Sequence, residues 1–190
     1  EEMGIEVVSV LTGDGRVDEI RRAHGAKLNV VQCAGSMTKL AKAMQEQYGI
    51  PFEKVSFFGI EDTSDAPYRV AKFFGDPDVL AAPRTPVSPA TRKLVCREVG
   101  NVLPELRAFK RDLDGKRAGL YVGGAFKAFS LVRALRQLGV KVALAGTQTG
   151  SQEEYEELQA VCDENTIVVD DTNPLELSSF LVEQDIDVFI

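Results

Sequence analysis

The chain has few of the residues on which disulfide frameworks and histidine-based sites depend. Its 190 residues include one histidine, His24, and three cysteines, Cys33, Cys96 and Cys162. The cysteines are odd in number, far apart and never in a Cys-x-x-Cys pair, so neither a disulfide framework nor a local zinc site is predicted. We interpret His24 as a surface residue beyond an exposed helix, which argues against cysteine–histidine catalysis. Any metal site must therefore combine distant segments.

The chain also lacks an excess of basic charge and long apolar runs. It has 22 Lys and Arg against 29 Asp and Glu, a formal net charge of -7, which argues against nucleic acid as the main partner. No apolar stretch approaches the roughly 20 residues that cross a bilayer, and the first residues carry no secretory pattern, so we expect no membrane partner and a cytoplasmic protein. Strand-like runs at 5–11 and 185–190 stand at the two ends, so we expect a fragment of a longer protein.

Alternating strand and helix patterns predict an α/β fold with parallel sheets. We interpret the chain as two incomplete, doubly wound Rossmann-like domains, at 1–75 and, truncated, at 116–190. Between them, 76–115 is a proline-containing linker followed by a bridging helix, which Gly100 and Pro104 are expected to bend. The expected strands are 5–11, one around 30–33, 54–58, 116–122, 141–145, 166–170 and 185–190. The expected helices are 16–23, 37–48, 63–74, 88–113, 126–138, 152–162 and 174–183.

A glycine pair, Gly123-Gly124, follows the expected strand 116–122 and precedes a helix. Such a turn brings backbone amides close to a ligand at the positive end of the helix, which predicts an anion-binding loop. Neither Gly-x-Gly-x-x-Gly spacing nor a Walker loop is present, so a nucleotide-binding module is only an alternative. Lys127 in the first turn opposes the helix dipole unless an anion lies nearby, although a solvated lysine is the simpler interpretation.

Cys33 ends another expected strand and precedes a helix. Free amides and the helix dipole at that position stabilise a thiolate, the form that binds metals, although on position alone a buried, inert cysteine is the better interpretation. The acidic pairs Glu61-Asp62 and Asp170-Asp171 follow strands as well. They suit Mg²⁺ binding in principle, but helix capping is the commoner role for both.

Six stretches carry a resemblance to a known family. They are Leu-Asn-Val-Val-Gln-Cys-Ala-Gly-Ser-Met (28–37), Tyr-Gly-Ile-Pro (48–51), Phe-Phe-Gly-Ile-Glu-Asp (57–62), Tyr-Val-Gly-Gly-Ala-Phe-Lys-Ala-Phe-Ser (121–130), Gly-Thr-Gln-Thr-Gly (146–150) and Val-Asp-Asp-Thr-Asn-Pro-Leu-Glu-Leu (169–177). Together they resemble the nitrogenase component 1 family, and within it the members on which the iron-molybdenum cofactor is matured. The resemblance covers nearly the whole chain, with 83–89 the least familiar part.

The resemblance implies a cofactor-binding site and no catalytic residue in this chain. Cys33 would supply the thiolate that holds one end of an iron-sulfur precursor of the cofactor, with Ser36 beside it. Gly123 and Gly124 would turn their amides toward the bridging sulfides of the cluster, and Lys127 would lie near the pocket. Ordinary clusters need four protein ligands, so a cluster on one thiolate must be held mainly by its own sulfides. We expect no cluster on the fragment alone.

The resemblance also implies partners: a related N-type subunit in a heterotetramer, the nitrogenase iron protein and cofactor-delivery proteins. Catalytic nitrogenase subunits have Cys-Tyr-Arg-Ser where this chain has Cys33-Ala34-Gly35-Ser36. The smaller side chains favour a scaffold that accepts and releases a cluster. A catalytic alpha-type subunit of nitrogenase, or of a related chlorophyll-pathway reductase, is the alternative.

Overall fold

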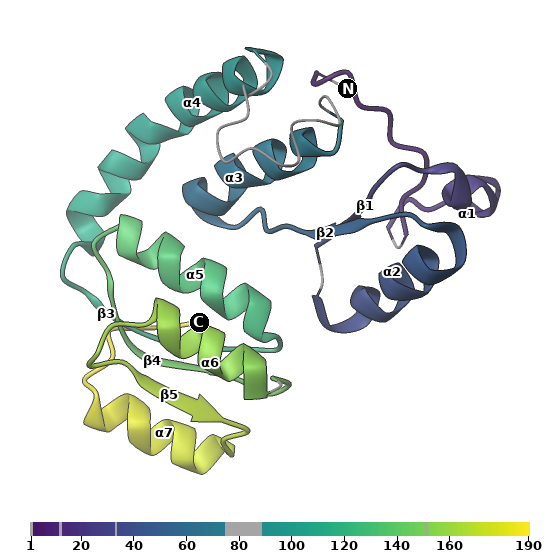
Figure 1. Cartoon of the computed structure of the whole chain (residues 1–190). Coiled ribbons are helices and arrows are strands. Elements are labelled where there is room, and N and C mark those ends of the chain that lie inside the picture. The colour runs from purple at the N-terminus through teal and green to yellow at the C-terminus, as the bar shows by residue number, and fades with distance from the viewer. Residues whose placement is uncertain (1, 12, 33, 75–88, 151) are drawn as a thin grey trace. The chain divides into compact units, whose positions relative to one another are not determined.

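The computed structural model describes residues 2–11, 13–32, 34–74, 89–150 and 152–190, which form two compact units (Figure 1). The first unit comprises 1–55 and 64–99, and the second comprises 56–63 and 100–190. Both units contain parallel strands with helices between them, which confirms the α/β, Rossmann-like fold class. The predicted domain boundaries at 75 and 115 stay a prediction.

The first unit is built around a two-stranded parallel sheet in which β1 pairs with β2. Helix α2 connects the two strands, and its Ala41 and Met44 are buried one helical turn apart. Gly49, with a φ of 70°, directly follows this helix in the left-handed conformation that commonly ends helices. The elements are α1 (Val17–Arg22), the short helix η1 (Ala23–Gly25), β1 (Asn29–Val31), α2 (Ala34–Tyr48), β2 (Phe52–Lys54), α3 (Gly59–Lys72) and α4 (Pro89–Leu113).

Three predictions for the first part of the chain were wrong. The run 5–11 is not a strand, and Val7 and Val10 are 68% and 45% exposed; its β-branched residues favour a strand, but no strand among the described residues pairs with it. Strand β2 is 52–54 instead of 54–58. Helix α3 begins at Gly59 instead of 63, because the φ of 74° at this glycine turns the chain directly after Phe58. The expected helix 88–113 is present as α4 (Pro89–Leu113) and includes Gly100 and Pro104, and the bend expected at these two residues stays a prediction.

The second unit contains a four-stranded sheet in which every neighbouring pair of strands is parallel. The strand order is β5-β4-β3-β6. Helices α5 and α6 cover one face of the sheet and α7 covers the other (Figure 1). The elements are β3 (Arg117–Val122), α5 (Ala125–Gln137), β4 (Lys141–Thr147), α6 (Gln152–Val161), β5 (Ile167–Asp170), α7 (Pro174–Glu183) and β6 (Val188–Phe189).

Apolar side chains of the sheet and of α5 form the core of the second unit. Leu120, Val142 and Ala145 of the strands pack with Phe129 and Val132 of α5. Strand β4 is buried from Val142 to Thr147, as expected of a central strand covered by helices on both faces. The nearly unbroken apolar run of this strand is therefore explained by its position in the sheet.

The order of the strands reverses at β3. The chain runs from β3 outward through β4 to β5, and then returns to the other side of β3 with β6. In open parallel sheets, ligands bind outside the carboxyl ends of the strands at such a switch point. The loop that follows β3 is thus the position in this unit that the topology favours for a ligand.

Among the described residues, none of the helices is both long and apolar enough to cross a membrane.

Candidate functional site

The loop after β3 consists of Gly123 and Gly124 and leads directly into α5. Gly124 is the N-cap residue, and its carbonyl oxygen accepts hydrogen bonds from the amides of Lys127 (3.1 Å) and Ala128 (3.3 Å). No side chain caps this end of the helix. The first-turn amides of a thirteen-residue helix therefore face the loop without a side-chain acceptor, which is the arrangement that receives anions.

Neither glycine of this loop is required by the chain around it. A Cβ built on Gly123 or on Gly124 meets no atom within 4 Å, and Gly124 has an ordinary extended φ of -163°. Gly59 and Gly146 differ, because a Cβ there would lie 2.8 Å and 2.5 Å from the nearest atom. Packing explains those two glycines, whereas the pair at 123–124 leaves an open space over exposed backbone.

Lys127 lies in the first turn of α5 and is exposed. No acidic residue stands in that turn, and no carboxylate of the described side chains forms an ion pair with Lys127. A cation at the amino end of a helix is unfavourable, because this end of the helix dipole is already positive. The loop and the lysine together favour a negatively charged ligand.

Hydrogen bonds join the loop after β4 to the glycine loop, and the loop after β5 to strand β3. The Thr149 hydroxyl donates to the Gly123 carbonyl oxygen at 2.6 Å. The Tyr121 hydroxyl accepts from the Thr172 amide at 3.0 Å and donates to the Thr172 carbonyl at 3.2 Å. The Tyr155 hydroxyl donates to the Thr147 carbonyl at 2.6 Å. Burial, and then the neighbouring Asp170 carboxylate, raise the pKa of Tyr155 far above its ordinary value, so it remains a donor.

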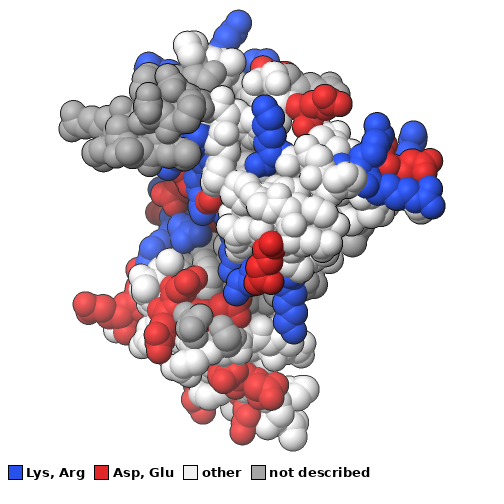
Figure 2. All heavy atoms as spheres, turned by 45° about the vertical axis from the view of Figure 1, so that its right-hand side comes forward, with Lys and Arg blue, Asp and Glu red and all other residues white. Residues whose placement is uncertain are grey.

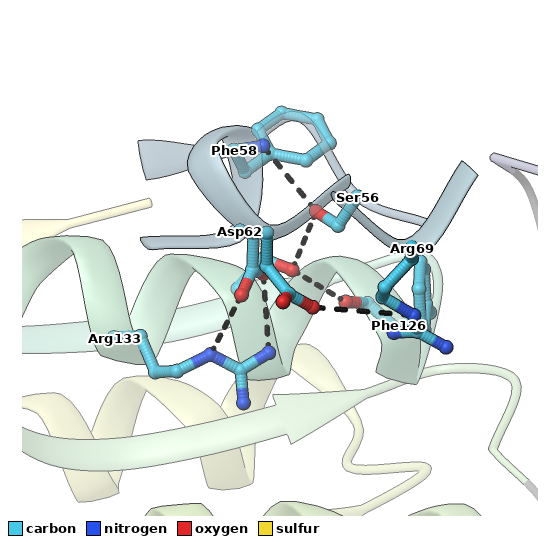
Figure 3. Close-up of polar contacts among 8 residues, drawn as sticks. Ser56, Phe58, Asp62, Arg69, Phe126 and Arg133 are labelled. Atoms are coloured by element: carbon cyan, nitrogen blue, oxygen red, sulfur yellow. Dashed lines mark hydrogen bonds and ion pairs between the residues drawn. The ribbon is translucent and has the colours of Figure 1, made fainter. Parts of the chain in front are cut away.

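A line of hydrogen bonds joins the segment before α3 to α5 (Figure 3). The Ser130 hydroxyl donates to the Phe126 carbonyl at 3.2 Å, which uses its only proton. Ser130 must then accept from Ser56 at 2.7 Å, and Ser56 accepts from the Phe58 amide at 3.3 Å. Both serines are buried, and the donor and the acceptor of each hydrogen bond in this line are therefore fixed.

An ion pair beside this line joins the same two segments (Figure 3). The Arg133 guanidinium donates from Nε and from Nη2 to the two carboxylate oxygens of Asp62, each at 3.1 Å. The Asp62 side chain is only 15% exposed, so this bidentate pair is partly shielded from water. Segment 56–63 is therefore fastened to the helix that carries the glycine loop.

The structure accounts for some predicted site residues and leaves others untested. It places the glycine pair and Lys127 at one helix terminus, as described above. Cys33 and the side chain of Ser36 lie outside the described residues, so their roles stay predictions. In the part of the chain that is described, no three His, Cys, Asp or Glu side chains form a group that could hold a metal ion.

Mg²⁺ binding and helix capping were the two roles expected for the acidic pairs. Asp62 of the first pair instead forms an ion pair with Arg133. Helix α7, which follows the pair Asp170-Asp171, is capped by Asn173, whose side chain accepts from the amides of Leu175 and Glu176. Sequence reasoning missed the serine line and the Asp62–Arg133 pair. Their partners are 71 to 74 residues apart, and no local pattern marks them.

Comparison with known proteins decides the family. The family model for nitrogenase component 1 type oxidoreductases matches residues 1–190. The chain belongs to this family. The nitrogenase iron-molybdenum cofactor biosynthesis protein NifE of Clostridium pasteurianum is 42% identical over all 190 residues, and that of Methanosarcina barkeri is 41% identical. The nitrogenase molybdenum-iron protein alpha chain of Methanothermobacter marburgensis is 35% identical over 191 residues.

Solved structures of the nitrogenase family agree with this assignment. The structure of nitrogenase Cp1 at pH 5 superposes with a TM-score of 0.83 at 27% identity, over 99% of this chain and 42% of that one. The chain spans 40% and 39% of the lengths of the two NifE relatives and 40% of the alpha chain. The likeness therefore concerns one part of a longer nitrogenase-family protein.

Proposed function

We propose that the protein acts, as part of a longer subunit, as a scaffold that holds an iron-sulfur precursor of the nitrogenase iron-molybdenum cofactor during its maturation. The open space over Gly123 and Gly124 carries this proposal, since these glycines have no packing role in the chain. The NifE relatives, which are named as iron-molybdenum cofactor biosynthesis proteins, support it. The cluster is the cargo of the scaffold.

The residues suit an anionic cluster that brings its own sulfide bridges. The amides of Gly123 and Gly124 would donate to bridging sulfides, which a Cβ on either residue would hold at a distance. Lys127 would offset the negative charge of the cluster. Cys33 would supply the one thiolate ligand, with Ser36 beside it. One thiolate does not satisfy an ordinary four-ligand cluster, so the fit is to a cluster held mainly by its surroundings.

Assembly with other proteins belongs to the same proposal. The longer protein would form a heterotetramer with a related N-type subunit, and would receive and release the cluster through the nitrogenase iron protein and cofactor-delivery proteins. The chain spans only about 40% of the length of its NifE relatives, so we expect stable occupancy only in the assembled, full-length protein.

A catalytic alpha-type subunit is the second candidate, and the 35% identity to the Methanothermobacter alpha chain favours it. The two candidates are distinguished at Ala34 and Gly35, because the resemblance gives catalytic subunits a tyrosine and an arginine at these positions. Two small residues leave more room beside Cys33, which suits a cluster that enters and leaves. Retention of a bound cluster that reduces substrate in the assembled protein would favour the catalytic function.

Iron content provides the test. The full-length protein would be purified anaerobically with its partner subunit as wild type, Cys33→Ser and Gly124→Val, and its iron and its iron-sulfur absorbance would be measured per heterotetramer. We expect both variants to lose most of the iron that is bound at this site while their thermal unfolding stays unchanged.

Gly100→Val is the matched control, because a Cβ on Gly100 in α4 also meets no atom within 4 Å. This variant should retain the iron of the wild type. Equal iron in wild type and Gly124→Val would refute the proposed role of the loop. Titration of the protein with ATP and nucleotide sugars in a calorimeter separates the nucleotide-binding alternative, which micromolar binding would support.

A further inference from the structure

Charge is distributed unevenly along the second unit. Residues 116–150 contain six Lys and Arg and no Asp or Glu, whereas residues 151–190 contain twelve Asp and Glu and no Lys, Arg or His. The second stretch forms α6, β5, α7 and β6. Acidic side chains gather over this lower part of the molecule in the space-filling view (Figure 2). The proposed function uses none of this surface.

The sheet ends within the acidic stretch. Strand β5 pairs with β4 on one side and has no partner strand among the described residues on the other. A groove lies between β5 and α6. Val168 and Asp170, alternate residues of β5 that share one face, and Thr166 directly before the strand line the groove together with Tyr155 and Glu156 of α6.

The edge has neither a cation, nor a proline, nor a bulge that would oppose the addition of a basic strand. Natural edge strands are often protected by lysines, prolines or bulges. Strand β5 reads Ile-Val-Val-Asp, with no proline and no cation, and its pairing with β4 is in continuous register. Its four-residue length limits any added strand to a short footprint.

We propose that this edge binds a short, extended, basic segment of another protein as an added parallel or antiparallel strand. Main-chain groups of β5 would pair with the guest, and its alternate side chains would lie in the groove, where Glu156 and Asp170 offer carboxylates to lysine or arginine. A second copy of this chain fits poorly, because it would bring one acidic face against another. This inference is independent of cluster binding.

Fluorescence anisotropy with labelled octapeptides tests the proposal on the 190-residue chain and on the full-length protein. The probe is an alternating Lys-Val peptide, and the comparison is an alternating Glu-Val peptide. We expect the first to bind with an affinity that falls as salt rises, and the second not to bind. Two further versions of the Lys-Val peptide are N-methylated on every second amide, one on the odd-numbered and one on the even-numbered residues. We expect one of these two versions to bind at least fivefold more weakly than the unmethylated probe, because an added strand needs the amide donors that face β5.

Two matched charge reversals locate the site. Glu156→Lys should weaken binding about fivefold, in keeping with a partly exposed ion pair. Glu183→Lys, at the end of α7 and outside the groove, makes the same change in net charge and should weaken binding less than twofold. Equal losses in both variants, full binding by both N-methylated peptides, or a dimer that Glu156→Lys dissociates would overturn the proposal.

Discussion

Replacing Gly146 by alanine should destabilise the second unit by about 2–3 kcal/mol, the upper part of the range for overpacked cores. A Cβ at this position would lie 2.5 Å from Val169 Cγ2, 2.8 Å from the Val169 carbonyl oxygen and 2.9 Å from Tyr121 Cδ2. Gly146 is paired with Val169 on one side and with Tyr121 on the other. Neither Val169 nor Tyr121 can move away easily. The Val169 contact includes its backbone carbonyl oxygen, and the Tyr121 hydroxyl forms two hydrogen bonds with the backbone of Thr172.

Gly124→Ala is the comparison for this prediction. Open space and an extended φ at Gly124 allow a methyl group without strain. We expect no loss, or a gain of about 0.4–1 kcal/mol from the reduced entropy of the unfolded chain. Urea unfolding followed by far-ultraviolet circular dichroism measures both variants. A loss below about 0.5 kcal/mol at Gly146, or equal losses at both glycines, would refute the packing argument.

Three further predictions concern ionisable groups. Arg133→Met should cost about 2 kcal/mol of unfolding free energy, because it leaves the shielded Asp62 carboxylate unpaired, and Asp62→Asn in the same chain should recover part of that loss in a double-mutant cycle. Burial raises the pKa of the Cys162 thiol to about 11, so iodoacetamide at pH 8 should modify the exposed Cys96 much faster than Cys162, as peptide mass spectrometry would show; equal rates would contradict this. The Arg117 amide and then the Lys116 ammonium lower the pKa of Asp187 below its ordinary 3.8, so the carboxylate stabilises the fold above that pH. The stability difference between wild type and Asp187→Asn should therefore be full at pH 7 and shrink as the pH falls below 3.8, and a difference that grows in acid would contradict the assignment.

The second unit could be predicted from sequence almost element by element. Its strands are apolar runs, and its helices begin and end at local signals such as Pro174. The glycine loop and the first-turn Lys127 were also visible, because strand, glycine pair and helix follow one another directly. Local pattern and tertiary structure agree in this part of the chain, which is why periodicity sufficed.

The remaining features depend on contacts that no local pattern encodes. The run 5–11 has strand propensity, but the described residues provide no partner strand, and pairing decides whether such a run becomes a strand. The early start of α3 follows from a positive φ at Gly59 and its close approach to Ala134, 75 residues away in the sequence. Long-range packing settled both outcomes, and a single sequence does not reveal it.

The hydrogen bonds from Phe58 through Ser56 to Ser130 all run in one direction, so hydrogen exchange at the Phe58 amide reports on the contact of segment 56–63 with α5. That amide donates to the Ser56 hydroxyl, which in turn donates to Ser130 on α5. When the segment lifts from α5, the Ser56–Ser130 bond breaks and the Ser56 hydroxyl, the acceptor of this N–H, becomes free to rotate. The rate at which the Phe58 amide hydrogen exchanges with deuterium would thus measure how often segment 56–63 separates from α5, the helix that follows the glycine loop.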